Sequence, residues 1–266
     1  VYKRQVTNVA ARPGASRRVQ GAQRRGRRTV EGMSTPEASI PEVARVAQDL
    51  IRFDTSNFGG GNAKGEREAA EYVGAYLEGL GLETEYFEPI ARRTNVHARI
   101  PGRDRSKPAL VVHGHLDVVP AMADDWSVDP FAGEIRDGVL WGRGAVDMKN
   151  MDAIILTAVG DILRAGRQPE RDLIVTFFAD EENGGIEGSQ LVVRDRPGWF
   201  AGATEAISEV GGYSIDVAGK RAYLLQVGEK GLIWIRLTAR GAAAHGSRVH
   251  HDNAVTKLAR LSLIHI

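Results

Sequence analysis

The stretch at residues 109–120 reads ALVVHGHLDVVP, in which a nearly continuous apolar run leads to His115 and Asp117. Residues 172–182, DLIVTFFADEE, have the same form, with an apolar run that ends in acidic residues. Apolar runs without polar alternation are typical of strands in a central sheet covered on both faces. Both stretches therefore predict buried strands whose carboxyl ends carry charged side chains.

Helices and shorter strands are expected around these two strands. The helices are at residues 40–53, 66–80 and 149–164, and the strands are at residues 83–87, 95–100 and 205–210. Strands that alternate with helices favour an α/β sandwich with a mixed sheet. An alternating strand at residues 231–241 and a helix from residue 252 indicate the opening of a second domain. The glycine-rich residues 56–65 lack the context of a phosphate-binding loop, so a flexible loop is expected there.

Composition excludes several classes of protein. The 266 residues include no cysteine, which rules out a disulfide scaffold, a thiolate metal site and a cysteine nucleophile. No apolar run approaches the ~20 residues that span a bilayer, and the N-terminus lacks the apolar core of a secretory signal. We therefore expect a soluble, cytoplasmic protein with no membrane partner.

The formal net charge of +1 hides an uneven distribution. Residues 1–32 carry nine Lys and Arg and a single acid, which leaves a formal charge of −7 for residues 33–266. An acidic globular part argues against a nucleic-acid-binding surface. A nucleic-acid-binding role would rest on the arginine-rich leader alone, so no nucleic-acid partner is expected.

Both ends of the chain look foreign to the protein. Residues 1–5 (VYKRQ) can be written GTG TAT AAG AGA CAG, whose reverse complement encodes LSLIH, the sequence of residues 261–265. Such a relation is typical of a transposase adapter from a sequencing library, and the alternative is coincidence. We therefore expect residues 1–32 to be a non-native or disordered basic leader before a true start at Met33. Residues 261–266 are interpreted as an adapter-derived tail.

Acidic residues and a histidine gather where the expected strands end, which is the ligand-binding edge of an α/β sheet. Crowded carboxylates repel one another unless a cation or a proton neutralises them, and a pair of divalent metal ions ~3.5–4 Å apart can do so. Histidine and carboxylate donors without thiolate favour Zn, with Co or Mn as alternatives. The residues concerned are His115, Asp117, Asp147, Asp180, Glu181, Glu182 and Glu209.

Each of these residues also has a simpler interpretation. His115 and Asp117 occupy alternate strand positions and face the same side, so they could form a structural hydrogen-bonded pair. Asp147 could cap the helix that follows it, and residues 181–182 could be an ordinary solvated acidic pair. The convergence of the clusters on one edge favours the metal site. The histidines interpreted as structural or surface residues are His113, His250 and His251.

Four motifs in order resemble those of one metallopeptidase family. They are HGHLDVVP (113–120), LWGRGAVDMKN (140–150), FFADEENGG (177–185) and AAHGS (243–247). The series is similar to that of the aminoacylase, carboxypeptidase G, acetylornithine deacetylase and succinyl-diaminopimelate desuccinylase family of di-zinc enzymes. The resemblance implies a truncated α/β sandwich of zinc-exopeptidase type with an inserted α+β lid, which dimerises. Residues 33–228 would be the N-terminal part of the catalytic domain, and residues 229–260 the beginning of the lid.

The resemblance also implies two metal sites. His115 and Glu209 resemble ligands of the first metal, and Glu182 resembles a ligand of the second. Asp147 resembles the carboxylate that bridges both, and the family pattern implies a cis peptide bond between Asp147 and Met148. The family's second metal also takes a histidine from late in the chain, which nothing in this sequence matches. We therefore expect the chain as written to bind the second metal poorly and to be inactive.

Three residues resemble the family's catalytic residues. Glu181 matches the general base, and Asp117 matches the carboxylate that fixes the ring of His115. His245 matches an oxyanion donor from the lid of a partner subunit, which implies a homodimer. The implied activity is hydrolysis of amide bonds in small peptides or N-acyl amino acids. A general peptidase is favoured over a deacylase of the acetylornithine deacetylase or succinyl-diaminopimelate desuccinylase type. An inactive relative that serves as a binding module is the alternative, and the intact Glu181 speaks against it.

Overall fold

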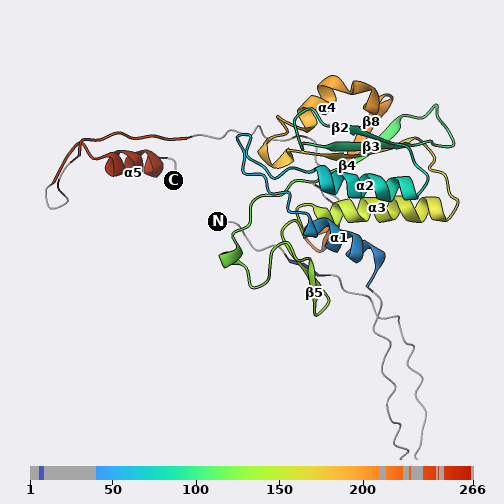
Figure 1. Cartoon of the computed structure of the whole chain (residues 1–266), viewed down its shortest axis with the longest axis horizontal. Coiled ribbons are helices and arrows are strands. Elements are labelled where there is room, and N and C mark those ends of the chain that lie inside the picture. Colours follow the sequence, from blue (N-terminus) through green and yellow to red (C-terminus); the bar gives the residue numbers. More distant parts are fainter. Residues whose placement is uncertain are drawn as a thin grey trace, which may run out of the picture. The chain divides into compact units, whose positions relative to one another are not determined.

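A computed structural model of the chain shows two compact units, Val1–Leu225 and Gln226–Ile266, and each is described by itself. The structure describes residues 6–8, 40–209, 214–223, 228, 236–243, 245 and 249–264. The first unit is built on a sheet with helices on both faces (Figure 1). The predicted α/β class is therefore confirmed.

The central sheet has five strands in the order β2-β3-β7-β4-β8. β3 runs antiparallel to β2 and to β7, whereas β4 runs parallel to both β7 and β8. The sheet is thus mixed, as predicted. Its strands are β2 (Thr84–Phe87), β3 (Asn95–Ile100), β4 (Ala109–His115), β7 (Leu173–Phe178) and β8 (Ala203–Ile207).

Strands β4 and β7 carry the two apolar runs of the sequence and lie side by side within the sheet. Their parallel pairing extends from Leu110 opposite Leu173 to His115 opposite Phe178. Five of the six side chains of β7 are buried, as expected for a strand covered on both faces. Because the two strands are parallel, their carboxyl ends reach the same edge of the sheet. This pairing positions the candidate site.

Helices cover the sheet on both faces (Figure 1). Helices α1, α2 and α3 share one core with the sheet, in which Leu50, Val73 and Phe177 are fully buried. On the other face, Val192 of α4 and Trp199 pack near Phe178. The helices are α1 (Glu42–Arg52), α2 (Arg67–Gly79), α3 (Lys149–Arg164) and α4 (Ser189–Asp195).

A second, small sheet contains the hairpin of β5 (Glu134–Arg136) and β6 (Val139–Trp141). The turn residues Asp137 and Gly138 have φ values of 53° and 74°, and Asp-Gly is the pair that favours positive φ at both turn positions. This hairpin was not predicted from the sequence, although the Asp-Gly pair signals it. The third strand is β1 (Val6–Asn8), which pairs with β6. The rest of the predicted leader lies outside the described residues.

Other elements differ from the sequence prediction at the end of the first unit. β8 begins and ends earlier than the strand predicted at 205–210, and its pairing with β4 has a register shift beside Ala109. Helix α4 was not predicted, since seven residues are too few to show a helical period. The hairpin of β9 (Ser214–Val217) and β10 (Lys220–Tyr223) was also not predicted.

The described part of the second unit contains helix α5 (Ala254–Ile264), as predicted from residue 252. The side-chain oxygen of Asn253 accepts a hydrogen bond of 3.1 Å from the backbone N–H of Thr256, which caps the helix. Of the strand predicted at residues 231–241, the first five residues lie outside the described part, and residues 236–241 form no strand. No helix among the described residues is long and apolar enough to cross a membrane.

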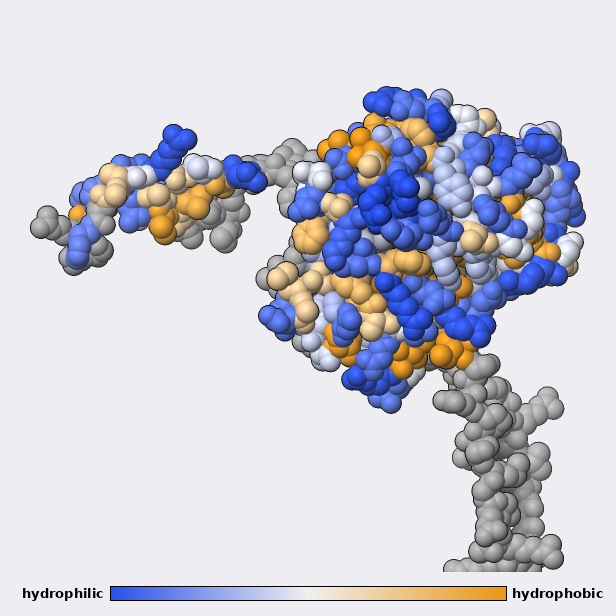
Figure 2. All heavy atoms as spheres, viewed as in Figure 1, coloured by the Kyte–Doolittle hydropathy of each residue, from blue (hydrophilic) through white to orange (hydrophobic). Residues whose placement is uncertain are grey.

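Hydrophilic residues cover much of the face of the first unit that Figure 2 shows. Apolar side chains gather instead in the core, as burial of apolar area favours. An apolar cavity of about 660 Å³ lies between α4 and the strands β4 and β8, with Val111, Val193 and Phe200 among its lining residues. Its lining includes His113 but none of the predicted metal ligands.

His97 of β3 is a buried titratable residue of the core. Its ring stacks on Trp199 with ring centroids 4.6 Å apart, and its Nδ1 lies 3.1 Å from Oγ1 of Thr176. Burial lowers the pKa of His97 to about 4. An ordinary histidine, as in the unfolded chain, has a pKa of about 6.5. Between pH 6.5 and 4 the ring is therefore neutral in the folded chain and takes up a proton in the unfolded chain.

We expect the free energy of unfolding to fall as the pH drops from 6.5 towards 4, because only the unfolded chain gains the proton on His97 in this window. The loss due to His97 reaches up to about 3 kcal/mol. Urea unfolding at pH 7 and pH 4.5 measures it, and His97→Gln should show a smaller pH dependence than the parent chain. His251→Gln, at an exposed residue, is the control. An unchanged pH dependence in His97→Gln would contradict the assignment.

Candidate metal centre

The carboxyl edge of β4 and β7 brings the predicted site residues together. His115 is the last residue of β4, and residues 181–183 form a short 3-10 turn after β7. Glu209 follows the end of β8 by two residues, and Asp147 comes two residues before α3. Four separate segments of the chain therefore deliver a histidine and carboxylates to one place.

Three carboxylates face a single nitrogen of His115. The ring is buried, with 2% of the residue exposed. Its Nε2 lies 3.2 Å from an oxygen of Asp147 and 3.2 Å from an oxygen of Glu209. An oxygen of Glu181 lies 3.5 Å from the same nitrogen. Carboxylates that converge in this way need a shared proton or a cation between them.

Glu182 joins the same cluster. Ligand atoms of His115, Asp147 and Glu182 all lie within 4.8 Å of one another, a spacing that could hold a metal ion. The side chain of Glu182 also has a structural contact, since its Oε1 accepts a hydrogen bond of 3.1 Å from the backbone N–H of Val119. Asp147 and His115 therefore belong both to the group that contains Glu209 and to the group that contains Glu182.

Asp147 does not cap the helix that follows it. The N-cap position of α3 is Met148, and no side chain caps the helix there. The capping interpretation is thus wrong, because the Asp147 carboxylate is turned towards His115 instead. The peptide bond between Asp147 and Met148 is cis, as the family resemblance implied.

Asp117 is completely buried and supports residues of the centre through hydrogen bonds. Its main-chain oxygen lies 3.0 Å from Nδ1 of His115, closer than its carboxylate at 3.5 Å. Its carboxylate instead accepts the backbone N–H groups of Glu181 and Glu182, both at 3.0 Å. Burial alone would raise the pKa of Asp117. The neighbouring His115 and the hydrogen bonds from Asn57 and the N–H of Glu182 together hold that pKa below its usual value. Asp117 therefore links the histidine ring to the turn that carries both glutamates.

The protonation of the cluster reflects an excess of negative charge. Burial lowers the pKa of His115, but hydrogen bonds to neighbouring carboxylates outweigh it and raise the pKa well above its ordinary value. The hydrogen bond from His115 lowers the pKa of Asp147. Burial, reinforced by the charge of Asp147, raises the pKa of Glu182 to about 8. Burial also raises the pKa of Glu181. A divalent cation fits this donor set, which is rich in oxygen and contains one imidazole.

Two charged residues at the start of α3 lie beneath the site. The Nζ of Lys149 donates hydrogen bonds to the main-chain oxygens of Leu50 and Phe53, at 2.9 and 2.7 Å, and so satisfies carbonyls at the C-terminal end of α1. Burial lowers the pKa of Lys149 to about 8. Asp152 is also fully buried, and its carboxylate oxygens have no hydrogen-bond partner among the described residues. Burial raises the pKa of Asp152 well above its usual value. Sequence patterns predicted neither burial.

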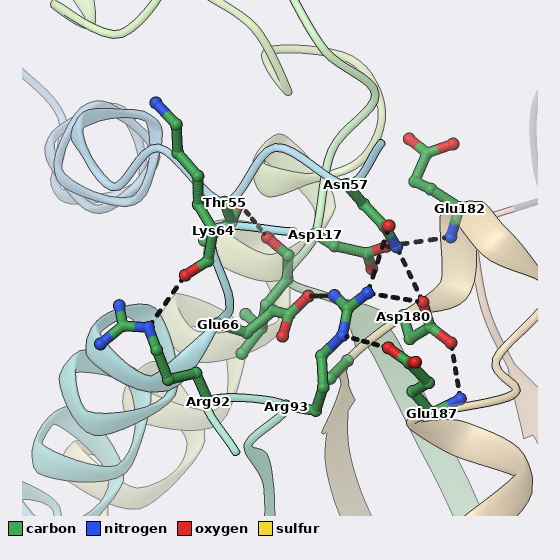
Figure 3. A network of polar contacts seen from close by, with 12 residues as sticks. Thr55, Asn57, Lys64, Glu66, Arg92, Arg93, Asp117, Asp180, Glu182 and Glu187 are labelled. Carbon is green, nitrogen blue, oxygen red and sulfur yellow. Dashed lines mark hydrogen bonds and ion pairs between the residues drawn. The ribbon is translucent and has the colours of Figure 1, made fainter. Parts of the chain in front are cut away.

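A buried polar network extends from Asp117 away from the metal centre (Figure 3). The side-chain amide of Asn57 donates to Asp117 at 2.8 Å and to Asp180 at 2.9 Å. Arg93 is 2% exposed and forms ion pairs with Asp180, Glu66 and Glu187. Asn57 and Arg93 were both missed by the sequence analysis. Asn57 falls within the predicted flexible loop, so the structure corrects that prediction at this residue.

The sequence profile of Peptidase family M20/M25/M40 matches residues 111–252. The chain belongs to this family. The matched range begins within β4 and includes every residue predicted for the metal centre, together with His245. The resemblance that the four motifs carried is thereby confirmed.

The chain is similar to curated proteins that are named as a desuccinylase and an aminoacylase. Succinyl-diaminopimelate desuccinylase of Rhodospirillum centenum is 35% identical over 229 residues, which are 82% of this chain and 55% of that protein. Aminoacylase-1 of Sus scrofa is 33% identical over 183 residues, which are 67% of this chain and 43% of that protein. The chain spans about half the length of the curated relatives it matches.

Solved structures of the family share the fold. A metallo-carboxypeptidase of the M20 family from Sulfolobus solfataricus superposes with a TM-score of 0.55 at 22% identity, over 64% of this chain and 37% of that one. Human carnosine dipeptidase 1 gives a TM-score of 0.53 at 21% identity, over 63% of this chain and 38% of that one. At these identities the likeness concerns the fold alone.

His245, predicted as an oxyanion donor, lies in the second unit and is exposed. Its role stays a prediction, because the two units are described separately. His113 packs edge-on against Phe178 with ring centroids 5.4 Å apart, which supports its interpretation as a structural residue. His250 and His251 are exposed, in agreement with their interpretation as surface residues.

Loss of the Asp117 carboxylate should weaken metal binding by this M20 chain. In Asp117→Asn, an NH₂ group replaces one of the two carboxylate oxygens. The single remaining oxygen would then have to accept the N–H groups of Glu181, Glu182 and Asn57. We expect the zinc affinity to fall about 10–100-fold, as is usual when a partner of a metal ligand is removed. Isothermal titration calorimetry measures the affinity. Asp161→Asn, on an exposed side chain, is the control, and equal affinities for both variants would refute the role of Asp117.

Proposed function

We propose that the full-length protein is a metal-dependent hydrolase that cleaves amide bonds in small peptides or N-acyl amino acids. The observation that carries the proposal is the convergence of Asp147, Glu209 and Glu181 on one nitrogen of His115. Membership of a peptidase family supports it. An amide bond hydrolyses slowly without help, so a site that gathers a base and metal ligands suits this reaction.

Two divalent ions would occupy the centre, with Zn favoured and Co or Mn as alternatives. His115 and Glu209 would bind the first ion, Glu182 the second, and Asp147 would bridge them. Among the described residues the second ion would have fewer protein ligands than the first. A further ligand, a histidine by family resemblance, is expected from the part of full-length relatives that this chain does not span.

Glu181 is the proposed general base. Bound metal ions would supply a water molecule of lowered pKa and polarise the carbonyl of the substrate. Glu181 accepts the proton of the attacking water as the new C–O bond forms, and delivers it to the amine nitrogen as the C–N bond breaks. Its raised pKa suits both transfers, and the hydrogen bond from its N–H to Asp117 keeps it beside His115.

The remaining parts of the proposal concern partners. His245 would donate a hydrogen bond to the oxyanion from the lid of a partner subunit, so the full-length protein would be a homodimer. A cytoplasmic location without nucleic-acid or membrane partners is proposed from the sequence composition. Between substrates, a general peptidase remains the first proposal. The desuccinylase and aminoacylase similarities favour an N-acyl amino acid deacylase as the second. Screening dipeptides and N-acyl amino acids with full-length protein and added Zn, Co or Mn separates them.

Substitution of the base should slow hydrolysis strongly without loss of metal binding. In full-length protein, Glu181→Gln is expected to lower kcat about 10²–10⁴-fold, because the amide cannot take a proton from water. Metal content, measured by mass spectrometry of the eluted ions, should stay equal to that of the parent protein. Glu83→Gln, at an exposed residue, is the control. A kcat in Glu181→Gln close to that of the parent protein would refute the mechanism, and an inactive parent protein would favour the binding-module alternative.

The two proposed metal sites should differ in affinity in the chain itself. Calorimetric titration with zinc is expected to show one tighter and one weaker site, since His115 and Glu209 both serve the first. Glu209→Ala should weaken the tighter site, and Glu182→Ala should weaken the other. Two equal sites, or variants with unchanged affinities, would contradict this assignment of ligands.

A further inference from the structure

We propose that Arg93 is a positioning residue, which clamps the loop of residues 180–187 and thereby holds Glu181 and Glu182 at the metal centre. The inference rests on the functions proposed for those two glutamates. Arg93 lies outside the centre, two residues before β3. It contacts none of the proposed metal ligands through any described hydrogen bond or ion pair.

Arg93 reaches both ends of the loop at once (Figure 3). Its Nη2 lies 2.9 Å from Oδ1 of Asp180, which opens the loop, and its Nε lies 3.1 Å from Oε2 of Glu187, which closes it. Its Nη1 lies 2.5 Å from Oε1 of Glu66 at the start of α2. The guanidinium group therefore ties the loop to a helix of the core.

The loop itself depends on Asp180. This residue has a left-handed backbone with φ of 65°, which aspartate adopts more readily than most residues. Its Oδ2 accepts a hydrogen bond of 2.7 Å from the N–H of Glu187, and its main-chain oxygen accepts one of 2.6 Å from Gly185. The Asp180 carboxylate thus closes the loop on one side and meets Arg93 on the other.

Asn57 extends the clamp to the opposite side of the turn. Its Oδ1 accepts a hydrogen bond of 3.2 Å from Nη2 of Arg93, which orients the amide. The amide nitrogen can then donate to both Asp180 and Asp117. Asp117 in turn accepts the backbone N–H groups of residues 181 and 182. Through Asn57, Arg93 is connected to both carboxylates that hold the turn.

The chemistry of the side chain explains why arginine is needed. Four of its five N–H groups would be used by Asn57, Glu66, Asp180 and Glu187, in a planar fork that a lysine ammonium cannot reproduce. Because the group is buried and its donors are engaged, it is not available to a substrate. Burying such a network is costly in desolvation, so its value lies in fixing one conformation of the loop.

The test compares Arg93→Lys with Arg92→Lys, a matched control at the neighbouring, half-exposed arginine. Hydrogen–deuterium exchange of the chain should accelerate about tenfold or more in residues 179–188 of Arg93→Lys, with β4 and β7 unchanged. Arg92→Lys should leave that loop unchanged. Unchanged exchange in the loop of Arg93→Lys would overturn the proposal, and so would acceleration spread equally over the sheet.

A second variant tests the same proposal if Arg93→Lys does not fold. Glu187→Gln removes one arm of the clamp at a partly exposed side chain, and it should loosen the same loop alone. An unaffected loop in Glu187→Gln would also overturn the proposal.

Zinc titration separates this inference from the proposed function. The affinity of the site that includes Glu182 should fall about 10–100-fold in Arg93→Lys, whereas the site of His115 and Glu209 should change less. If Glu182→Ala leaves zinc binding unchanged, the proposed ligand set fails, but the exchange result still tests the clamp. If Glu182→Ala weakens binding and Arg93→Lys does not, the clamp fails and the ligand set stands.

Discussion

Carboxylates that converge on His115 repel one another, and the surrounding structure has to hold them in place. Asp147, Glu209 and Glu181 all approach Nε2 of one buried ring. Left to itself, such a cluster would separate or take up protons. Burial, together with the neighbouring carboxylates, raises the pKa values of Glu181 and Glu182. The parallel pairing of β4 with β7 holds His115 and the turn that carries Glu181 at one edge of the sheet.

Buried charges around the centre are compensated in different ways. Asp117 accepts backbone N–H groups and the amide of Asn57, so its charge is held by dipoles. Asp180 is held by the full charge of Arg93. Lys149 is surrounded by carbonyl oxygens at the end of α1, where a cation complements the helix dipole. The site therefore depends on α1 and α2 as well as on the sheet, although neither helix supplies a proposed ligand.

Local sequence patterns predicted the parts of the structure that depend on local interactions. The apolar runs of β4 and β7 and the helical period of α3 were sufficient to place these elements, and the acids at the strand ends predicted the residues of the centre. Arg93 and Asn57 were missed because their partners lie far away in the sequence. Asp180 follows Arg93 at a sequence separation of 87 and Asn57 at one of 123. No local period encodes such contacts. The capping interpretation of Asp147 failed for a related reason, since its partner His115 comes from another strand.

The bridging geometry of Asn57 limits which substitutions this part of the chain tolerates. One amide joins Asp117 to Asp180, and Arg93 orients that amide, so the four side chains act as a single unit. Free-energy costs of substitutions within such a unit do not add, because the first loss already releases the contacts that the second would remove. A favourable replacement of Arg93 would therefore require compatible residues at 57 and 180 together. Sequence change in this part of the protein is expected to be epistatic, with single steps blocked and combined ones tolerated.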